Sequence, residues 1–473
     1  MFRPMLRPML LWPCRLYGRM ENLILAHGLY RPGRLLLVMV GILAVRGLGD
    51  DIFAAFSGDR DSMFFPANDR YADFIKVALS YSHIFTQTLA DKAYLNHWPH
   101  IFRLYLLDNP YDLSAHNLAL PDDQADVTNL HLPPFASVLY LSCAHLIAAT
   151  NPLVAMAVFW GAYLIGGWGV ARMARAHFGV SRQCGRFILF AALACYPVLW
   201  MLSRGNLAGG YSGLLMLGWL ATAVSGRNRW AGWVMLALSV NLRPEPALLV
   251  LIELLGTGSL WARFCRMAIP GALSVALAAI TFPIAHALYP LYTPDNVRRG
   301  LRIYHYRYIV SDMGDEWNAS LFLWAKGVLM LMDVRPRYNE TLAQALELCG
   351  SAALLLAIWG AWARRITLPV LVFLLTALPA MFVPVYSYYH IVAFVAVLAL
   401  LVADLERNPP RPGDRRLPLL IVTVLVMSPL GGRYSNGLLD SLLMLGGTLY
   451  GLAPLARDAF RALGASPISA PAS

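Results

Sequence analysis

The chain has 473 residues, of which 58% are hydrophobic and 14% are charged, and its mean hydropathy is +0.55. Soluble domains carry about 25% charged residues, so the composition excludes an ordinary soluble protein and indicates a polytopic membrane protein. The net charge is +11. Because the arginines cluster between apolar runs, we attribute this charge to the positive-inside rule, and we expect no nucleic-acid partner.

The predicted fold is an all-α bundle, because the apolar runs are long, rich in Leu, Ala and Val, and free of period-two alternation. A basic cytoplasmic leader (1–33) precedes one transmembrane domain (34–460), and the tail (461–473) is expected to be disordered. Some runs are shorter than a full crossing requires, which leaves about 11–13 true spans. The candidate spans are 34–47, 134–149, 151–171, 186–202, 207–224, 230–242, 246–258, 267–289, 318–333, 343–362, 367–385, 388–403, 418–430 and 438–455.

The arginines also predict the orientation of the chain. The segments expected in the cytoplasm are the leader, 172–186, 226–229, 261–266, 363–365, 404–416 and the tail. The segments expected on the other side are 48–133, 203–206, 290–317, 386–390 and 431–437. Two full spans between 134 and 171 would place the arginines of 172–186 outside. Either Pro134–Ala149 is a half-helix or that basic loop breaks the rule, and 318–333 is expected to lie at the surface or to re-enter.

The polar segment 48–133 follows the first span and carries many aspartates. Asp73 begins an amphipathic stretch in which Phe74, Val77 and Tyr81 follow at helical spacing. A helix along the membrane surface would hold this carboxylate partly out of water, where its proton affinity rises and it can act as a general base.

Other aspartates of this segment compete with Asp73 for the role of base, namely Asp69, Asp50 and Asp51. The sequence Asp59-Arg60-Asp61 also has the spacing of a metal-binding Asp-x-Asp motif, but chance explains it better in a segment so rich in aspartate. The six dispersed cysteines indicate neither a zinc site nor a disulfide framework. We therefore expect neither a metal nor another cofactor.

Four further polar groupings lie on the side opposite the cytoplasm. Arg204 and Asn206 sit between two apolar runs, where they form either an interfacial turn or part of a site. Arg243 lies among prolines that should break a helix, so it either pairs with Glu245 or helps to form an anion site. The segment 292–317, with Arg302 among tyrosines, fits phosphate or sugar binding as well as an aromatic belt with snorkelling arginines. His390 completes the set.

Taken in chain order, these pieces resemble glycosyltransferase family 87, the alpha-mannosyltransferase-like proteins of the GT-C class. The resemblance runs from Asp73 to about Leu405. The chain departs from the family pattern at Gly205-Asn206, where the family often has Gly-Gln, and at Arg243-Pro244, where it often has Lys-Pro. The matching pieces are Ala72-Asp73-Phe74, Asn109-Pro110-Tyr111-Asp112, Pro133-Pro134-Phe135, Arg204-Gly205-Asn206, Ala231-Gly232, Arg243-Pro244-Glu245-Pro246, Trp317-Asn318-Ala319-Ser320-Leu321 and Pro384-Val385-Tyr386-Ser387 ending at His390.

The resemblance implies a GT-C-like enzyme of the bacterial inner membrane. It would transfer a hexosyl or pentosyl unit from a polyprenyl-phosphate sugar to a glycolipid or polysaccharide acceptor on the extracytoplasmic face, with inversion. Asp73, with Asp69 as its rival, would be the base. His390, Arg243 and Arg204 would bind the donor phosphate. The expected substrate-binding residues are Asn206, Asn318, Tyr111 and Arg302.

Two other classes of function are compatible with the sequence. A flippase or transporter of lipid-linked glycans would use broken helices and buried charges for translocation. A structural subunit of an envelope complex would need neither broken helices nor buried charges. The sequence leaves the sugar and the acceptor open, because selectivity depends on the shape of the pocket.

Overall fold

The computed structural model describes residues 21–57, 132–150, 152–256, 258–305, 320–332, 339–382, 392–429 and 436–464. Within these ranges the regular secondary structure is helical throughout, which confirms the predicted all-α class. The helices are α2 (Pro32–Ser57), α9 (Pro134–Ala149), α10 (Pro152–Phe178), α11 (Arg182–Ala194), α12 (Tyr196–Arg204), α13 (Leu207–Ser225), α14 (Arg229–Leu242), the 3-10 helix η3 (Glu245–Leu255), α15 (Leu260–Leu288), α16 (Pro294–His305), α17 (Leu321–Leu331), α18 (Asn339–Trp362), α19 (Leu368–Phe382), α20 (Phe394–Arg407), α21 (Arg416–Val426) and α22 (Asn436–Gly464).

Six helical segments of the described chain are long and apolar enough to cross a membrane. They lie in α2, α10, α11 with α12, α13, α15 and α18. Four further apolar helices are shorter, at 10–17 residues. A full crossing takes about 20 apolar residues. The long helices indicate an integral membrane protein, and they are fewer than the spans counted from the sequence.

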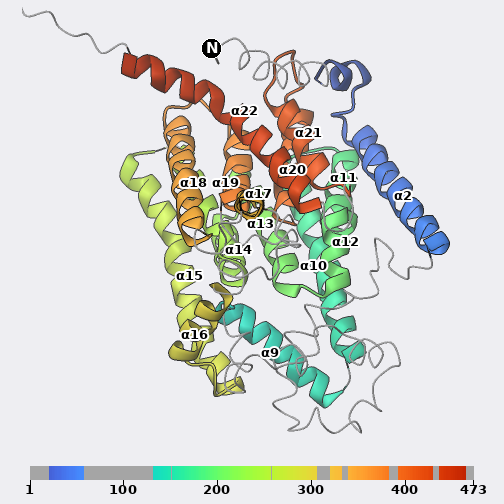
Figure 1. Ribbon diagram of the computed structural model, residues 1–473, viewed down its shortest axis with the longest axis vertical. Helices are drawn as coiled ribbons and strands as arrows, with labels where there is room; N and C mark the ends of the chain where they lie inside the picture. Colours follow the sequence, from blue (N-terminus) through green and yellow to red (C-terminus); the bar gives the residue numbers. More distant parts are fainter. Residues whose placement is uncertain are drawn as a thin grey trace, which may run out of the picture.

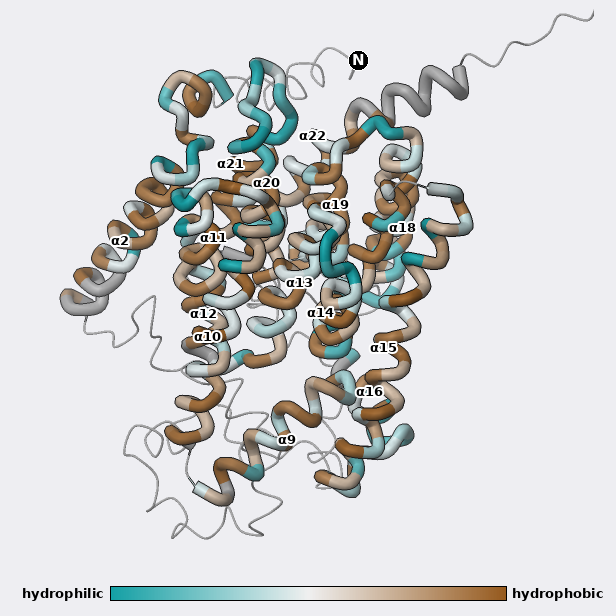
Figure 2. Tube along the Cα trace, turned by 180° about the vertical axis from the view of Figure 1, so that it is seen from behind, coloured by the Kyte–Doolittle hydropathy of each residue, from teal (hydrophilic) through white to brown (hydrophobic). Residues whose placement is uncertain are grey.

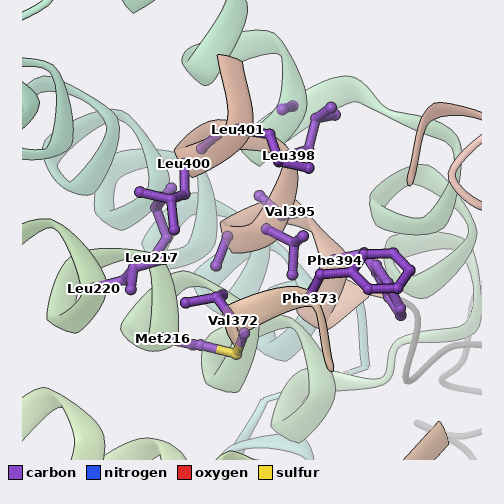
Figure 3. Packing of buried hydrophobic residues seen from close by; sticks show 14 of the residues in the cluster. Met216, Leu217, Leu220, Val372, Phe373, Phe394, Val395, Leu398, Leu400 and Leu401 are labelled. Atoms are coloured by element: carbon purple, nitrogen blue, oxygen red, sulfur yellow. The ribbon is translucent and has the colours of Figure 1, made fainter. Parts of the chain in front are cut away.

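The core of the bundle is formed by α13, α19, α20 and α21, and the longest apolar helices surround it (Figure 1). Side chains of α13, α19 and α20 interlock there, among them Leu217, Phe373 and Leu398 (Figure 3). In the apolar window of α13, 78% of the residues are buried, whereas in α15 only 11% are. A helix that is apolar all round but exposed needs an apolar solvent, so α15 fits a lipid-facing position.

The arginine-rich connections lie together at one end of the bundle, which we call the arginine end (Figure 1). Contacts between the connections confirm this grouping. His177, at the end of α10, is 2.6 Å from the hydroxyl of Ser225, at the end of α13. The backbone N–H of Ser181, before α11, donates to the carboxylate of Glu406 on α20 at 3.1 Å. The described connections that were predicted to be cytoplasmic therefore share one end of the molecule, and Figure 2 shows polar residues gathered there.

Helix α9 resolves the parity problem that the sequence posed. It lies obliquely across the opposite end, which we call the α9 end, and not alongside the other helices (Figure 1). Its buried side chains, such as Tyr140 and Ala144, share one cluster with Leu207 and Leu242, the end residues of α13 and α14, and α9 lies mainly against α15. Because α9 stays at one end, only α10 runs the length of the bundle between 134 and the arginines of 172–186. The half-helix alternative agrees with the structure.

Several predicted boundaries were wrong. Helix α2 continues to Ser57 and includes Asp50 and Asp51, which were expected in a loop. The predicted span 246–258 is a 3-10 helix. The segment 318–333, expected to lie at the surface or to re-enter, contains α17, which buries Phe322 and Lys326 but exposes Val328 and Leu331. Helix α22 continues to Gly464, beyond the predicted start of the disordered tail. Hydropathy identifies the residues that can lie in lipid. A helix can continue beyond those residues, so its ends do not coincide with the ends of the apolar run.

Arg416 fixes the connection between α20 and α21. Its guanidinium donates to the carboxylates of Asp414 at 3.0 Å and Asp404 at 2.8 Å, and to the carbonyl of Asn408 at 2.9 Å. Burial would raise the pKa of Asp414, but the hydrogen bonds from Arg416 outweigh it and hold the pKa below its usual value. The connection is therefore closed by a charge-assisted network at the arginine end.

We expect Arg416→Gln to destabilise the protein by about 1–2 kcal/mol, because two partly buried carboxylates lose their cation. Arg411→Gln, at an exposed position of the same connection, should change stability little. Since the pKa of Asp414 is depressed, the network stabilises the protein at neutral pH and this contribution is lost as pH falls through the depressed value. Thermal unfolding in detergent checks this. Equal effects of the two substitutions at neutral pH would contradict it.

Candidate functional site

The turns that contain Asn206 and Arg243 lie at the α9 end. Leu207 and Leu242 share one buried cluster with α9 and with Tyr289 and Tyr292, which follow α15. Asn206 precedes Leu207, and Arg243 follows Leu242. The two turns singled out in the sequence thus lie at the same end of the bundle, away from the arginine-rich connections (Figure 1).

Asn206 begins α13 as its N-cap. Gly205 ends α12 in the left-handed conformation, with φ of 70°. The side-chain carbonyl of Asn206 then accepts a hydrogen bond from the backbone N–H of Gly209 at 2.9 Å. This is the role that asparagine commonly plays before a helix, where backbone N–H groups lack partners. Asn206 is 3% exposed, so its described geometry fits the predicted interfacial turn.

Arg243 lies where the helix breaks, as the prolines predicted. Helix α14 ends at Leu242, and Arg243 is extended, with φ of −147° and ψ of 132°. Pro244 follows, and the chain continues as the 3-10 helix η3. The Arg243 side chain is partly buried and has an interaction partner. A guanidinium at a broken helix end is placed to meet an anion, because the helix interruption opens the backbone beside it.

Polar contacts between helices fix the position of the Arg243 turn. The hydroxyls of Ser212 on α13 and Ser239 on α14 are 2.9 Å apart. The amide of Asn241 donates to the hydroxyl of Ser274 on α15 at 2.8 Å and to its carbonyl at 3.0 Å. These three helices are therefore joined by buried and partly buried hydrogen bonds within one helical turn of Arg243. Inside a membrane, apolar surfaces alone do not determine how helices pair. Hydrogen bonds between helices fix their relative positions.

Tyr292 connects α15 to the start of α9. Its hydroxyl donates to the carbonyl of Leu132 at 3.0 Å, and its ring packs against Phe282 with the ring centres 5.3 Å apart. Burial raises the pKa of Tyr292, so the hydroxyl keeps its proton and remains a donor. The sequence had marked Tyr292 only as one aromatic residue of a loop. Its anchoring role could not be read from spacing, because the contact joins positions far apart in the chain.

Five predicted site residues lie outside the described residues: Asp73, Asp69, Tyr111, Asn318 and His390. For Arg204, the structure describes only the backbone, at the last position of α12. Their described neighbours in sequence can be located. Leu132, at the end of the aspartate-rich segment, receives the Tyr292 hydrogen bond. Val392, two positions after His390, is buried and lies against Gly213 of α13. Ser320, two positions after Asn318, is buried at the start of α17.

Arg302 differs from the other described candidates because it is exposed. It lies on α16, whose Val297 packs against the cluster that contains α9. The helix is therefore attached to the α9 end, but Arg302 is not enclosed with Asn206. Among the residues that the structure describes, no three His, Cys, Asp or Glu side chains are grouped as metal ligands.

Comparison with known proteins gives no relative: no family model, no curated protein and no solved structure matches this chain. The resemblance to glycosyltransferase family 87 stays a prediction from the motifs. What the structure establishes is an all-helical protein with six helices suited to a membrane, in the part of the chain that it describes.

Proposed function

We propose that the protein is a membrane glycosyltransferase that moves a hexosyl or pentosyl unit from a polyprenyl-phosphate sugar to a lipid or polysaccharide acceptor. One observation carries the proposal. Leu207 and Leu242, the neighbours of Asn206 and Arg243, share a buried cluster with α9 at the end opposite the arginine-rich connections. The aspartate-rich segment rejoins the described chain at that same cluster, through Leu132.

The positive-inside rule supports an extracytoplasmic position for this site, in a membrane such as the bacterial inner membrane. The arginine end would face the cytoplasm, so the α9 end would face away from it. A lipid-linked donor would then reach the site along the membrane with its phosphate at the surface. Arg243 lies at the end of α14, so in this proposal it would meet the phosphate at the extracytoplasmic surface.

The proposed reaction is a single displacement at the anomeric carbon. The acceptor hydroxyl attacks from the face opposite the polyprenyl phosphate and transfers its proton to the carboxylate of Asp73, or of its rival Asp69. The bond from the anomeric carbon to the phosphate oxygen breaks, and the configuration inverts. Negative charge grows on the leaving phosphate, and a guanidinium already in place stabilises this charge in the transition state.

The other proposed roles follow the same chemistry. Arg243 and Arg204 would bind the phosphate as cations, and His390 would donate a hydrogen bond to it. Asn318, Tyr111 and Asn206 would contact the sugar or the acceptor. A polyprenyl phosphate stabilised in this way is a sufficient leaving group without a metal ion.

Asp73→Asn should lower sugar transfer by about 10²–10⁴-fold, because the amide cannot accept the proton. The assay uses purified protein in detergent with a panel of polyprenyl-phosphate sugars, and mass spectrometry detects the products. Asp123→Asn, a matched change in the same polar segment, should keep activity. Full activity of Asp73→Asn would remove Asp73 from the mechanism. If the wild type forms no product with any donor but moves lipid-linked glycans across vesicles, the protein is a flippase.

Arg243→Gln should lower transfer by about 10²–10³-fold, because charge on the leaving phosphate loses its partner. Arg243→Lys should retain part of the activity, since it keeps the charge but not the planar fork of donors. Arg227→Gln, at the arginine end, is the matched control and should have no effect. Unfolding temperatures of all three variants show whether the bundle is intact. Unchanged transfer by Arg243→Gln in an intact bundle would contradict the assignment.

A further inference from the structure

Helix α16 presents cations on one side and apolar residues on another. Arg298, Arg302 and His305 recur at intervals of four and three residues, so they share one face of the helix. Val297 and Leu301 lie on a different face. Val297 packs against the cluster at the α9 end, whereas Leu301 remains 49% exposed. A short helix with this division of charge suits the boundary between lipid and water.

The depth of α16 follows from α15, the helix before it. Helix α15 has 29 residues, so it is about 43 Å long, which exceeds the hydrocarbon thickness of a bilayer. Large apolar side chains are exposed along it from Leu260 to Ile284. The chain then turns, with Tyr289 and Tyr292 buried, and α16 begins at Pro294. Helix α16 therefore starts where the lipid-facing surface of α15 ends.

The turn before α16 fixes how the helix leaves α15. The ring nitrogen Nδ1 of His286 is 3.2 Å from the carbonyl oxygen of Tyr292. The side-chain amide of Asn296 donates to the carbonyl of Leu291 at 2.9 Å. These contacts, with the buried tyrosine rings, attach the first turn of α16 to the bundle. The cationic face of α16 therefore has a fixed position relative to the end of α15.

Carboxylates offset the cations of this face only weakly. Arg298 is 3.6 Å from Asp295, and their side chains are 76% and 93% exposed. His305 is 3.6 Å from Glu340 at the start of α18, and both are also exposed. Exposed ion pairs of this kind contribute little. For Arg302, no carboxylate partner is present among the described residues. Arginines at the end opposite the other basic connections also run against the positive-inside rule, so they need another cause.

We propose that α16 lies in the headgroup layer of the membrane and that Arg298 and Arg302 bind the phosphates of anionic phospholipids. Leu301 would enter the apolar edge of the same leaflet, and the guanidinium groups would extend to the phosphates. The surface is complementary in charge to an anionic bilayer and is exposed where the bilayer would be. This role is independent of the glycosyltransferase proposal, and it assigns Arg302 to the membrane and not to the sugar substrate.

The test is hydrogen–deuterium exchange of the 294–305 peptide in full-length protein placed in lipid nanodiscs. In discs that contain phosphatidylglycerol, amide exchange in this peptide should be slower, by about fivefold or more, than in discs of phosphatidylcholine alone. The double variant R298Q/R302Q should lose this difference. The variant R298K/R302K should keep it, because a charged bilayer surface requires charge and not the bidentate geometry of arginine.

The matched control is R407Q/R411Q, which removes two exposed arginines with the same spacing at the arginine end. It should leave the protection of 294–305 intact. Equal exchange in the two lipid compositions, or protection that persists in R298Q/R302Q, would overturn the proposal. Inorganic phosphate added to phosphatidylcholine discs should not protect the peptide. If it does so as well as phosphatidylglycerol, α16 is a site for soluble phosphate and the lipid assignment is wrong.

Discussion

The cost of placing charge and unpaired backbone groups in hydrocarbon is the constraint on which this structure depends. It makes the spanning elements helical, because each helix pairs its own N–H and C=O groups. It also moves the arginines to the ends of the helices, where contacts such as Ser181 with Glu406 and Arg416 with Asp404 and Asp414 gather them. The two ends of the bundle therefore differ: one carries most of the basic connections, and the other carries α9, the broken end of α14 and α16.

The positive-inside rule accounts for the arginines at the arginine end, but it does not account for the polar residues at the α9 end. Two of these polar residues have a structural role. Asn206 caps α13, and Asn241 joins α14 to α15. Arg243 is partly buried at the end of α14 and has an interaction partner, and the helix breaks beside it at Pro244. The arginines of α16 differ again, because they face outward. The two proposals therefore use different residues of the α9 end. Arg243 would bind the phosphate of the sugar donor, and the arginines of α16 would bind the phosphates of membrane lipids.

Hydropathy and turn residues predicted much of the fold. The run 207–224 became α13 (Leu207–Ser225), and the prolines after Arg243 ended α14 as expected. The position of α9 could not be predicted, because its composition resembles that of a spanning helix and only contacts with α15, α10 and α14 place it. The hydrogen bond between Tyr292 and Leu132 could not be predicted either, because the two residues are far apart in the sequence. Of the site, the sequence located Asn206 and Arg243 at one end, while the roles assigned to Asp73 and His390 stay predictions.

The orientation of the bundle is the central claim, and impermeant labelling of single cysteines tests it most directly. The background is a variant in which the six native cysteines are replaced by alanine. A cysteine at Asp295, on α16, should react with a membrane-impermeant maleimide in intact cells. A cysteine at Arg411, between α20 and α21, should react only after the cells are permeabilised. The opposite pattern would turn the α9 end toward the cytoplasm and contradict the account of the site.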